Sequence, residues 1–171
     1  MKKLIPILLI ALVLPYVGSS QDERLSKVKT LDSTIETLYG VISGEAGEKR
    51  DWELFKYLFT ADAQLIPTVI REGKPSYISW TPDIYIQNAG VRIEESGFFE
   101  KEINRVTESF GSVTHVFSTY ESYRTAKDEE PFTRGINSIQ FMNDGSRWWI
   151  VNIYWTAESG DNPIPKKYLP K

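Results

Sequence analysis

The sequence contains no cysteine, so it can form no disulfide and cannot be anchored through a lipid-bearing cysteine. It contains one histidine, His115, so any imidazole chemistry must use that residue. One histidine without cysteine supplies too few ligands for a transition-metal site, and the acidic residues are not spaced as in a calcium loop. We therefore expect no metal and no cofactor.

Several functional motifs are also missing. The sequence has no Asn-x-Ser/Thr acceptor for glycosylation. It also has no Gly-x-Ser-x-Gly turn and no glycine-rich phosphate loop, so neither a hydrolase nor a kinase is supported. The formal net charge is -3, and no stripe of basic residues is present. We therefore expect no nucleic-acid partner.

The N-terminus has the pattern of a secretory signal peptide. Lys2 and Lys3 precede an uncharged run from Leu4 to Val17, and small residues follow it. We predict a signal peptide over residues 1–20 and a mature chain that begins near Gln21. This predicts an exported protein, periplasmic or secreted, with no membrane contact after cleavage. The alternative is an uncleaved N-terminal anchor.

The first half of the chain has helical periodicity. Apolar residues recur at steps of three and four over residues 24–43, and a second helix is predicted over residues 48–59. Residues 63–68 favour a short strand that stops at Pro67. A third helix is predicted from Thr81, the N-cap, and Pro82 to its end at Gly97.

The second half is rich in strand-forming residues. Four long runs are separated by Gly111, "AKDEEP" and "NDGS", which predicts an antiparallel meander. Helices followed by strands indicate an α+β protein, in which three N-terminal helices pack on a strongly curved antiparallel sheet and leave a conical pocket. We expect one domain over residues 21–171, with an extended tail at residues 161–171.

Three stretches carry a resemblance to a known superfamily: "GEAGEKRDWELFKYLFTADAQLIPT", "HVFSTYES" and "RGINSIQF" with "DGSRWWIVNIYW". They resemble uncharacterised exported members of the nuclear transport factor 2-like superfamily, which includes SnoaL-like polyketide cyclases, ketosteroid isomerase and scytalone dehydratase. The resemblance extends over roughly residues 31–169. It implies the α+β cone, a mostly apolar pocket and frequent dimers, but it does not fix the chemistry.

The last hairpin poses a question of register. If Asp144 and Gly145 form a two-residue loop, Gln140 faces Trp149; a three-residue loop with a bulge makes Gln140 face Trp148. In either register, Arg134, Ser138 and Gln140 share one face of their strand, because side chains alternate.

The polar set could line the pocket, because polar groups interleaved with apolar ones fit a cavity wall better than a sealed core. Alternatively, this face is the wet convex side of the sheet, and the opposite face, which carries Asn137, lines the pocket. The residues predicted to bind a ligand are Arg134, Ser138, Gln140, Asn137, Tyr120, Trp148 and Trp155.

His115 is the predicted catalytic residue, as a general base on a strand; the alternative is a structural histidine. A buried carboxylate could replace it, with Asp62, Glu100 and Glu102 as carriers. Another alternative places Trp148, Trp149 and Trp155 in a dimer interface.

The sequence thus favours a module that binds a small apolar molecule with a polar handle, and a homodimer. The alternatives are a proton-transfer enzyme of the isomerase, cyclase or dehydratase type, and a non-catalytic dimerisation module.

Overall fold

A computed structural model describes residues 18–171 of the chain. The predicted signal peptide, residues 1–20, lies outside the described residues except for the three that begin helix α1. Within the described part, no helix has the length and apolar character needed to cross a membrane.

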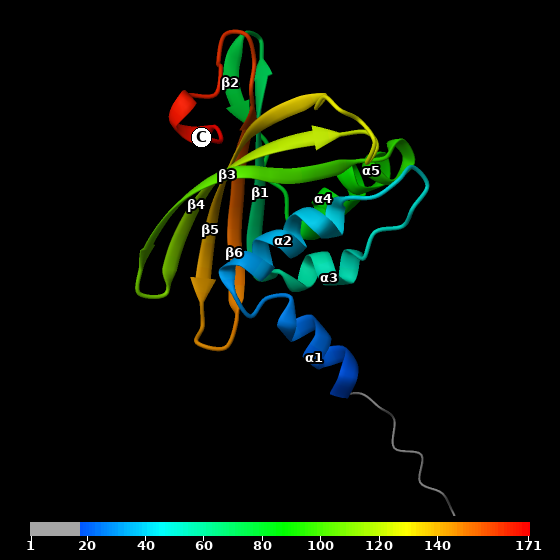
Figure 1. Ribbon diagram of the computed structural model, residues 1–171, viewed down its shortest axis with the longest axis vertical. Coiled ribbons are helices and arrows are strands. Elements are labelled where there is room, and N and C mark those ends of the chain that lie inside the picture. Colours follow the sequence, from blue (N-terminus) through cyan, green and yellow to red (C-terminus); the bar gives the residue numbers. More distant parts are fainter. Residues whose placement is uncertain (1–17) are drawn as a thin grey trace, which may run out of the picture.

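A curved six-stranded sheet forms the body of the molecule, and most helices lie on its concave side (Figure 1). The strand order is β2-β1-β6-β5-β4-β3. The strands are β1 (Phe59–Arg71), β2 (Lys74–Tyr77), β3 (Phe99–Phe110), β4 (Val113–Tyr123), β5 (Thr133–Asn143) and β6 (Trp148–Ala157). The α+β cone predicted from the sequence is therefore confirmed.

Three helical regions were predicted, and the structure divides them further. Residues 24–43 form parts of two helices, because the chain turns at residues 27–30 and Thr30 then caps the second. The helices are α1 (Gly18–Ser26), α2 (Leu31–Ile42), α3 (Trp52–Tyr57), α4 (Pro82–Tyr85), the π-helix η1 (Ile86–Gly90), α5 (Val91–Ser96) and the 3-10 turn η2 (Lys166–Tyr168). Thr81 is an N-cap as predicted, since its side chain accepts a hydrogen bond from the Ile84 N–H.

Strand β1 differs from its prediction in both length and pairing. It runs past Pro67 to Arg71, because Pro67 lies where the strand changes partner: it lies opposite Trp155 of β6, and its carbonyl accepts from the Ile78 N–H. β1 then turns through Glu72 and Gly73, both with positive φ, into the unpredicted strand β2. Since β1 is parallel to β6, the antiparallel meander covers only β3 to β6.

The last hairpin adopts neither register considered from the sequence. Asn143 pairs with Trp148, so the loop holds four residues. The Asp144 carboxylate accepts hydrogen bonds from the Ser146 and Arg147 backbone N–H groups and from the Trp149 ring, which stabilises this wider loop. A bulge between Ile150 and Asn152 then places Gln140 opposite Asn152 and Asn137 opposite Trp155.

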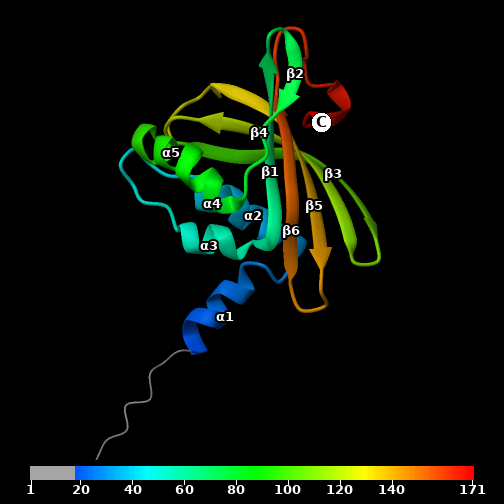
Figure 2. The same ribbon diagram turned by 180° about the vertical axis from the view of Figure 1, so that it is seen from behind.

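The two faces of β5 have different surroundings. Asn137, Ile139 and Phe141 are buried on the concave face against the helices, whereas Ser138 and Gln140 lie on the outer face. The C-terminal segment covers part of that outer face, as Figure 2 shows from behind. Its Tyr168 ring packs edge-on against Phe117, with 4.9 Å between ring centroids.

Gly135 lies on β5 directly opposite Tyr120 of β4. A Cβ at this position would overlap the Tyr120 hydroxyl and the Thr156 carbonyl oxygen, so both can approach the strand only because no side chain is present. Gly135 therefore lets the Tyr120 ring lie flat across the concave face.

Candidate functional site

A cavity of about 120 Å³ lies between the concave face of the sheet and the helices. Its wall is mainly apolar and aromatic, with a few polar groups. The lining residues are Leu38, Tyr39, Ile42, Phe55, Leu65, Tyr85, Phe98, Glu100, Tyr120, Asn137, Ile153 and Trp155. They come from α2, α3, α4, the bridge residue Phe98 and five of the six strands, so the cavity exists only in the assembled fold.

Glu100 carries the one carboxyl group in this wall. The start of β3 is held against the end of α2 by the backbone pair of Gly44 and Phe98, and the Glu100 N–H donates to the Ser43 hydroxyl at 3.0 Å. The Ser122 hydroxyl donates to the Glu100 carboxylate at 2.8 Å. Burial nevertheless dominates, and it raises the pKa of Glu100 to about 7.

A chain of hydrogen bonds leads from the cavity towards the surface. The Asn137 amide donates to the Tyr39 hydroxyl at 3.1 Å, and that hydroxyl is 2.7 Å from the Ser118 hydroxyl. Ser118 donates in turn to the carboxylate of Glu102. Burial raises the pKa of Tyr39, which therefore stays neutral. The chain fixes the Tyr39 ring as one wall of the cavity.

Two further tyrosines face the same space. Burial raises the pKa of the Tyr85 and Tyr120 hydroxyls, and the nearby Glu100 carboxylate raises it further. Tyr85 is also stacked on Phe55, with 5.3 Å between ring centroids. These neutral hydroxyls beside Glu100 offer hydrogen bonds to a ligand in the cavity.

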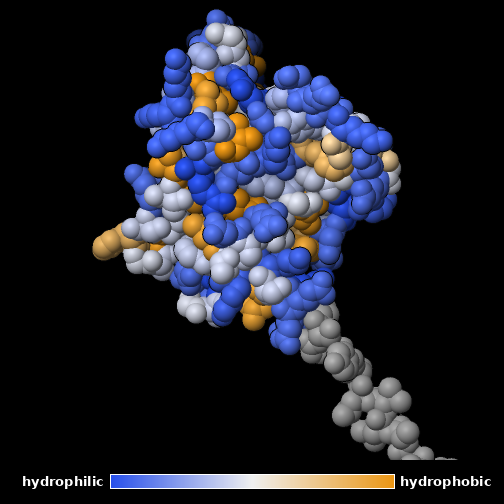
Figure 3. Space-filling view, viewed as in Figure 1, coloured by the Kyte–Doolittle hydropathy of each residue, from blue (hydrophilic) through white to orange (hydrophobic). Residues whose placement is uncertain are grey.

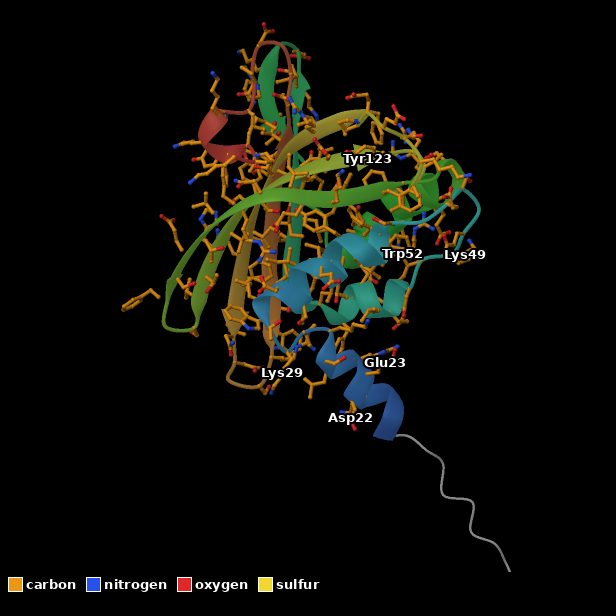
Figure 4. All side chains as sticks on the ribbon, viewed as in Figure 1. Asp22, Glu23, Lys29, Lys49, Trp52 and Tyr123 are labelled. Atoms are coloured by element: carbon orange, nitrogen blue, oxygen red, sulfur yellow. The ribbon has the colours of Figure 1, made fainter. Side chains whose placement is uncertain are left out.

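The segment between α2 and α3 is held in place by Arg50 and Glu94. The buried Arg50 guanidinium donates to the carbonyls of Ile42, Gly44 and Glu48. Glu94 accepts from the Trp52 ring and from Lys49, both at 2.8 Å, and these bonds hold its pKa at about 2. Figure 4 shows Lys49 and Trp52 at the same end of the molecule.

The structure divides the predicted ligand-binding residues between two faces. Tyr120, Asn137 and Trp155 line the cavity. The others do not: Trp148 packs on the core edge-on to Phe141, and Arg134 pairs with Glu158 at 2.7 Å. Arg134, Ser138 and Gln140 lie on the outer face of β5, so the cavity is lined by the Asn137 face, the alternative left open by the sequence.

His115 lies on the outer face as well. Its Nε2 is 3.0 Å from the Ser138 hydroxyl, and its Nδ1 is 3.7 Å from the Glu108 carboxylate. It does not line the cavity, so a general base acting there has to come from another residue. Among the carboxylates considered from the sequence, Asp62 is exposed, and Glu102 is bound to Arg105 at 2.6 Å.

Among residues 18–171, no three potential metal-ligating side chains are grouped closely enough to hold an ion.

No protein-family model matches this sequence, and no curated protein is significantly similar to it. Solved structures do match. A protein of unknown function with a cystatin-like fold, from Nostoc punctiforme, is 9% identical with a TM-score of 0.57, over 76% of this chain and 90% of that one. A "putative ketosteroid isomerase" from Parabacteroides distasonis is 12% identical with a TM-score of 0.50, over 77% and 91%. An "NTF-2 like protein of unknown function" from Silicibacter pomeroyi is 15% identical with a TM-score of 0.48, over 81% and 98%.

The chain shares the fold of the first two of these structures, and its curved sheet with helices on the concave side is the cone that the resemblance to nuclear transport factor 2-like proteins implied. At these identities the likeness establishes the fold alone, and the site must be argued from the residues themselves.

Sequence reasoning missed several residues that shape the cavity of this cone. Tyr39 follows Ile35 by four residues on the buried face of α2, so the helical period contained its signal. Tyr85 ends the short helix α4, Phe98 lies in an isolated bridge just before β3, and neither carried a comparable pattern. Glu100 was considered, but the charges that alternate around it are more typical of a solvated strand.

Proposed function

We propose that the cone binds a small, largely apolar molecule that carries one polar group, and that Glu100 receives that group. The observation that carries the proposal is the half-buried residue Glu100, whose carboxyl lines an aromatic cavity and has its pKa raised to about 7 by desolvation. A carboxyl kept away from water in this way costs stability, and such costs are typical of binding sites.

The test uses two adjacent residues on opposite faces of β6. Ile153 lines the cavity and is 6% exposed, whereas Tyr154 points outwards and is 47% exposed. A compound from a library of small molecules should raise the unfolding temperature of the wild type by roughly 5–10 °C at a hundred times its Kd. Ile153→Phe fills the cavity and should abolish this shift, and Tyr154→Phe should retain it. A shift that survives in Ile153→Phe would place the ligand elsewhere.

Proton transfer is the second candidate function, with Glu100 as the base in place of His115. A carboxyl with a pKa of about 7 is half ionised at neutral pH, which suits a general base. Tyr120 and Tyr85 would donate hydrogen bonds to the substrate oxygen. Turnover of a bound compound that disappears in Glu100→Gln and persists in His115→Gln supports this function, and the reverse result contradicts it.

A homodimer joined through the outer face of the sheet is also part of the proposal. Phe110 is 91% exposed and Val113 59% exposed at the tip of the β3–β4 hairpin, where Figure 3 shows apolar atoms projecting. Trp148 and Trp155 pack inwards against the core, which leaves Trp149 as the tryptophan available to this interface.

Light scattering at micromolar concentration should give about twice the chain mass. Val113→Glu should convert the dimer to a monomer, because a carboxylate would be buried at the interface. Val91→Glu, at a residue that is 51% exposed on α5, is the matched control and should not. A monomeric wild type would refute the dimer.

Export to the periplasm or the exterior is proposed on the N-terminal sequence pattern alone. N-terminal sequencing of the exported protein should show that the mature chain begins within a few residues of Gln21. An intact Met1 would contradict it.

A further inference from the structure

The cavity wall contains one acidic group and no basic group. Among its twelve lining residues, Glu100 is the only one whose ordinary charge is not zero near neutral pH. Six others are aromatic: Tyr39, Phe55, Tyr85, Phe98, Tyr120 and Trp155. An ionised Glu100 therefore has no cation beside it in the wall.

The charges just behind the wall do not compensate for this. Glu102 lies beyond Ser118, and its partner Arg105 also binds Asp32, with both distances at 2.6 Å. One guanidinium thus neutralises two carboxylates, and Glu100 is a third carboxylate in this region, without a cation of its own. The local charge around this side of the cavity is negative when Glu100 is ionised.

The aromatic rings of the wall also favour a positively charged ligand. The face of an aromatic ring carries negative charge density and attracts cations within about 6 Å of its centre. An anion in the cavity would meet both the ring faces and Glu100, and each would repel it. A neutral molecule would leave the Glu100 carboxylate without an opposite charge beside it.

The size of the cavity limits the ligand further. At about 120 Å³ it is slightly smaller than a cavity of roughly 150 Å³, which holds one benzene molecule. The ligand should therefore have on the order of five to seven non-hydrogen atoms. Steroid-sized molecules are excluded unless the cone opens.

We infer that the ligand of this cavity is a small alkylammonium ion, whose charged head lies among the aromatic rings and pairs with Glu100. This inference rests on the proposed function and names the chemical class of its ligand.

The inference predicts that binding depends on pH. The groups facing Glu100 are Tyr39 on α2, Tyr85 on α4, Tyr120 and Ser122 on β4, and Asn137 on β5. Burial keeps the tyrosines neutral, so Glu100 is the group that titrates near neutral pH. Cation binding should strengthen about tenfold between pH 6 and pH 8, as Glu100 ionises.

Calorimetry with two probes of one shape tests this. Choline carries the cation, and 3,3-dimethylbutan-1-ol replaces its nitrogen with carbon. At pH 8 the wild type should bind choline at least tenfold more tightly than the alcohol, and should release a proton on binding choline at pH 7. Glu100→Gln should lose this preference. Glu108→Gln, a matched change on the outer face of the same strand, should keep it.

The possible failures are distinguishable. If the alcohol binds as tightly as choline, or if choline binding does not change between pH 6 and pH 8, the cation inference is wrong and the binding function stands. The pH series needs no variant, so it decides the question even if Glu100→Gln does not fold. If neither choline, the alcohol nor any compound of the small-molecule library binds, the binding function fails as well.

Discussion

At pH 8, Glu100→Gln is expected to unfold at a higher temperature than the wild type, by roughly 5–10 °C. Burial raises the pKa of Glu100 from 4.5 to about 7. The folded protein therefore holds the proton on the Glu100 carboxyl more tightly than the unfolded chain does. The stability that comes from this group is fully present below about pH 4.5 and is lost as the pH rises through 7. Since a tenfold change in proton affinity is worth about 1.4 kcal/mol, folding at pH 8 bears a cost of about 3 kcal/mol.

The amide in Glu100→Gln has nearly the shape of the protonated acid and no charge to desolvate. The stabilisation should therefore be about 2–3 kcal/mol at pH 8 and should disappear at pH 4.5. Thermal unfolding at several pH values measures it, with Glu108→Gln as the control on the outer face, where no comparable gain is expected. An equal effect of Glu100→Gln at both pH values would mean that Glu100 is not a desolvated acid.

Arg50→Met is expected to destabilise the protein by about 3 kcal/mol or more. The guanidinium is buried and donates at 3.1 Å to Ile42, the last residue of α2, and at 2.6 Å to Gly44 and Glu48. Methionine would remove the Arg50 donor from the Ile42 and Glu48 carbonyls, whereas the Gly44 carbonyl would keep the hydrogen bond from the Phe98 N–H. Each buried carbonyl left unpaired costs about 1–3 kcal/mol. Gly44 also pairs with Phe98, so the start of β3 and the position of Glu100 should loosen.

The free energies of unfolding of the wild type and the variants are compared by urea unfolding. Arg50→Lys should lie between the wild type and Arg50→Met, because an ammonium group cannot span the same set of carbonyls. Arg92→Met is the control: Arg92 is exposed on α5 and bonds to Asn88 within its own helical region, so the loss should be below about 0.5 kcal/mol. A loss in Arg50→Met no larger than in Arg92→Met would contradict the proposed role of the guanidinium.

Local chemistry accounts for what the sequence predicted correctly about the fold. Thr81 and Pro82 start a helix because a hydroxyl can accept from a free backbone N–H and because proline has no N–H to leave unpaired. Alternation along β5 grouped Arg134, Ser138 and Gln140 apart from Asn137 in any register. The resemblance to nuclear transport factor 2-like proteins then indicated how helices and sheet combine.

Contacts between residues distant in the sequence decided which face of the sheet is concave and the register of the last hairpin. The alternating pattern of β5 does not indicate which of its faces is concave, because a polar face is compatible with either water or a cavity. Packing against α2 buried Asn137 on the concave face and left Ser138 and His115 on the outer face. The hairpin register depended on Asp144 binding the Trp149 ring, a contact that exists only once the loop has closed.

The sequence by itself determined the order of the elements and which side chains share a face, because both follow from local backbone geometry. Only the tertiary structure decided that Glu100 lies in an aromatic cavity. Its neighbours Tyr39, Tyr85 and Asn137 come from three separate elements, and a charged residue on a strand has no property of its own that distinguishes burial from exposure.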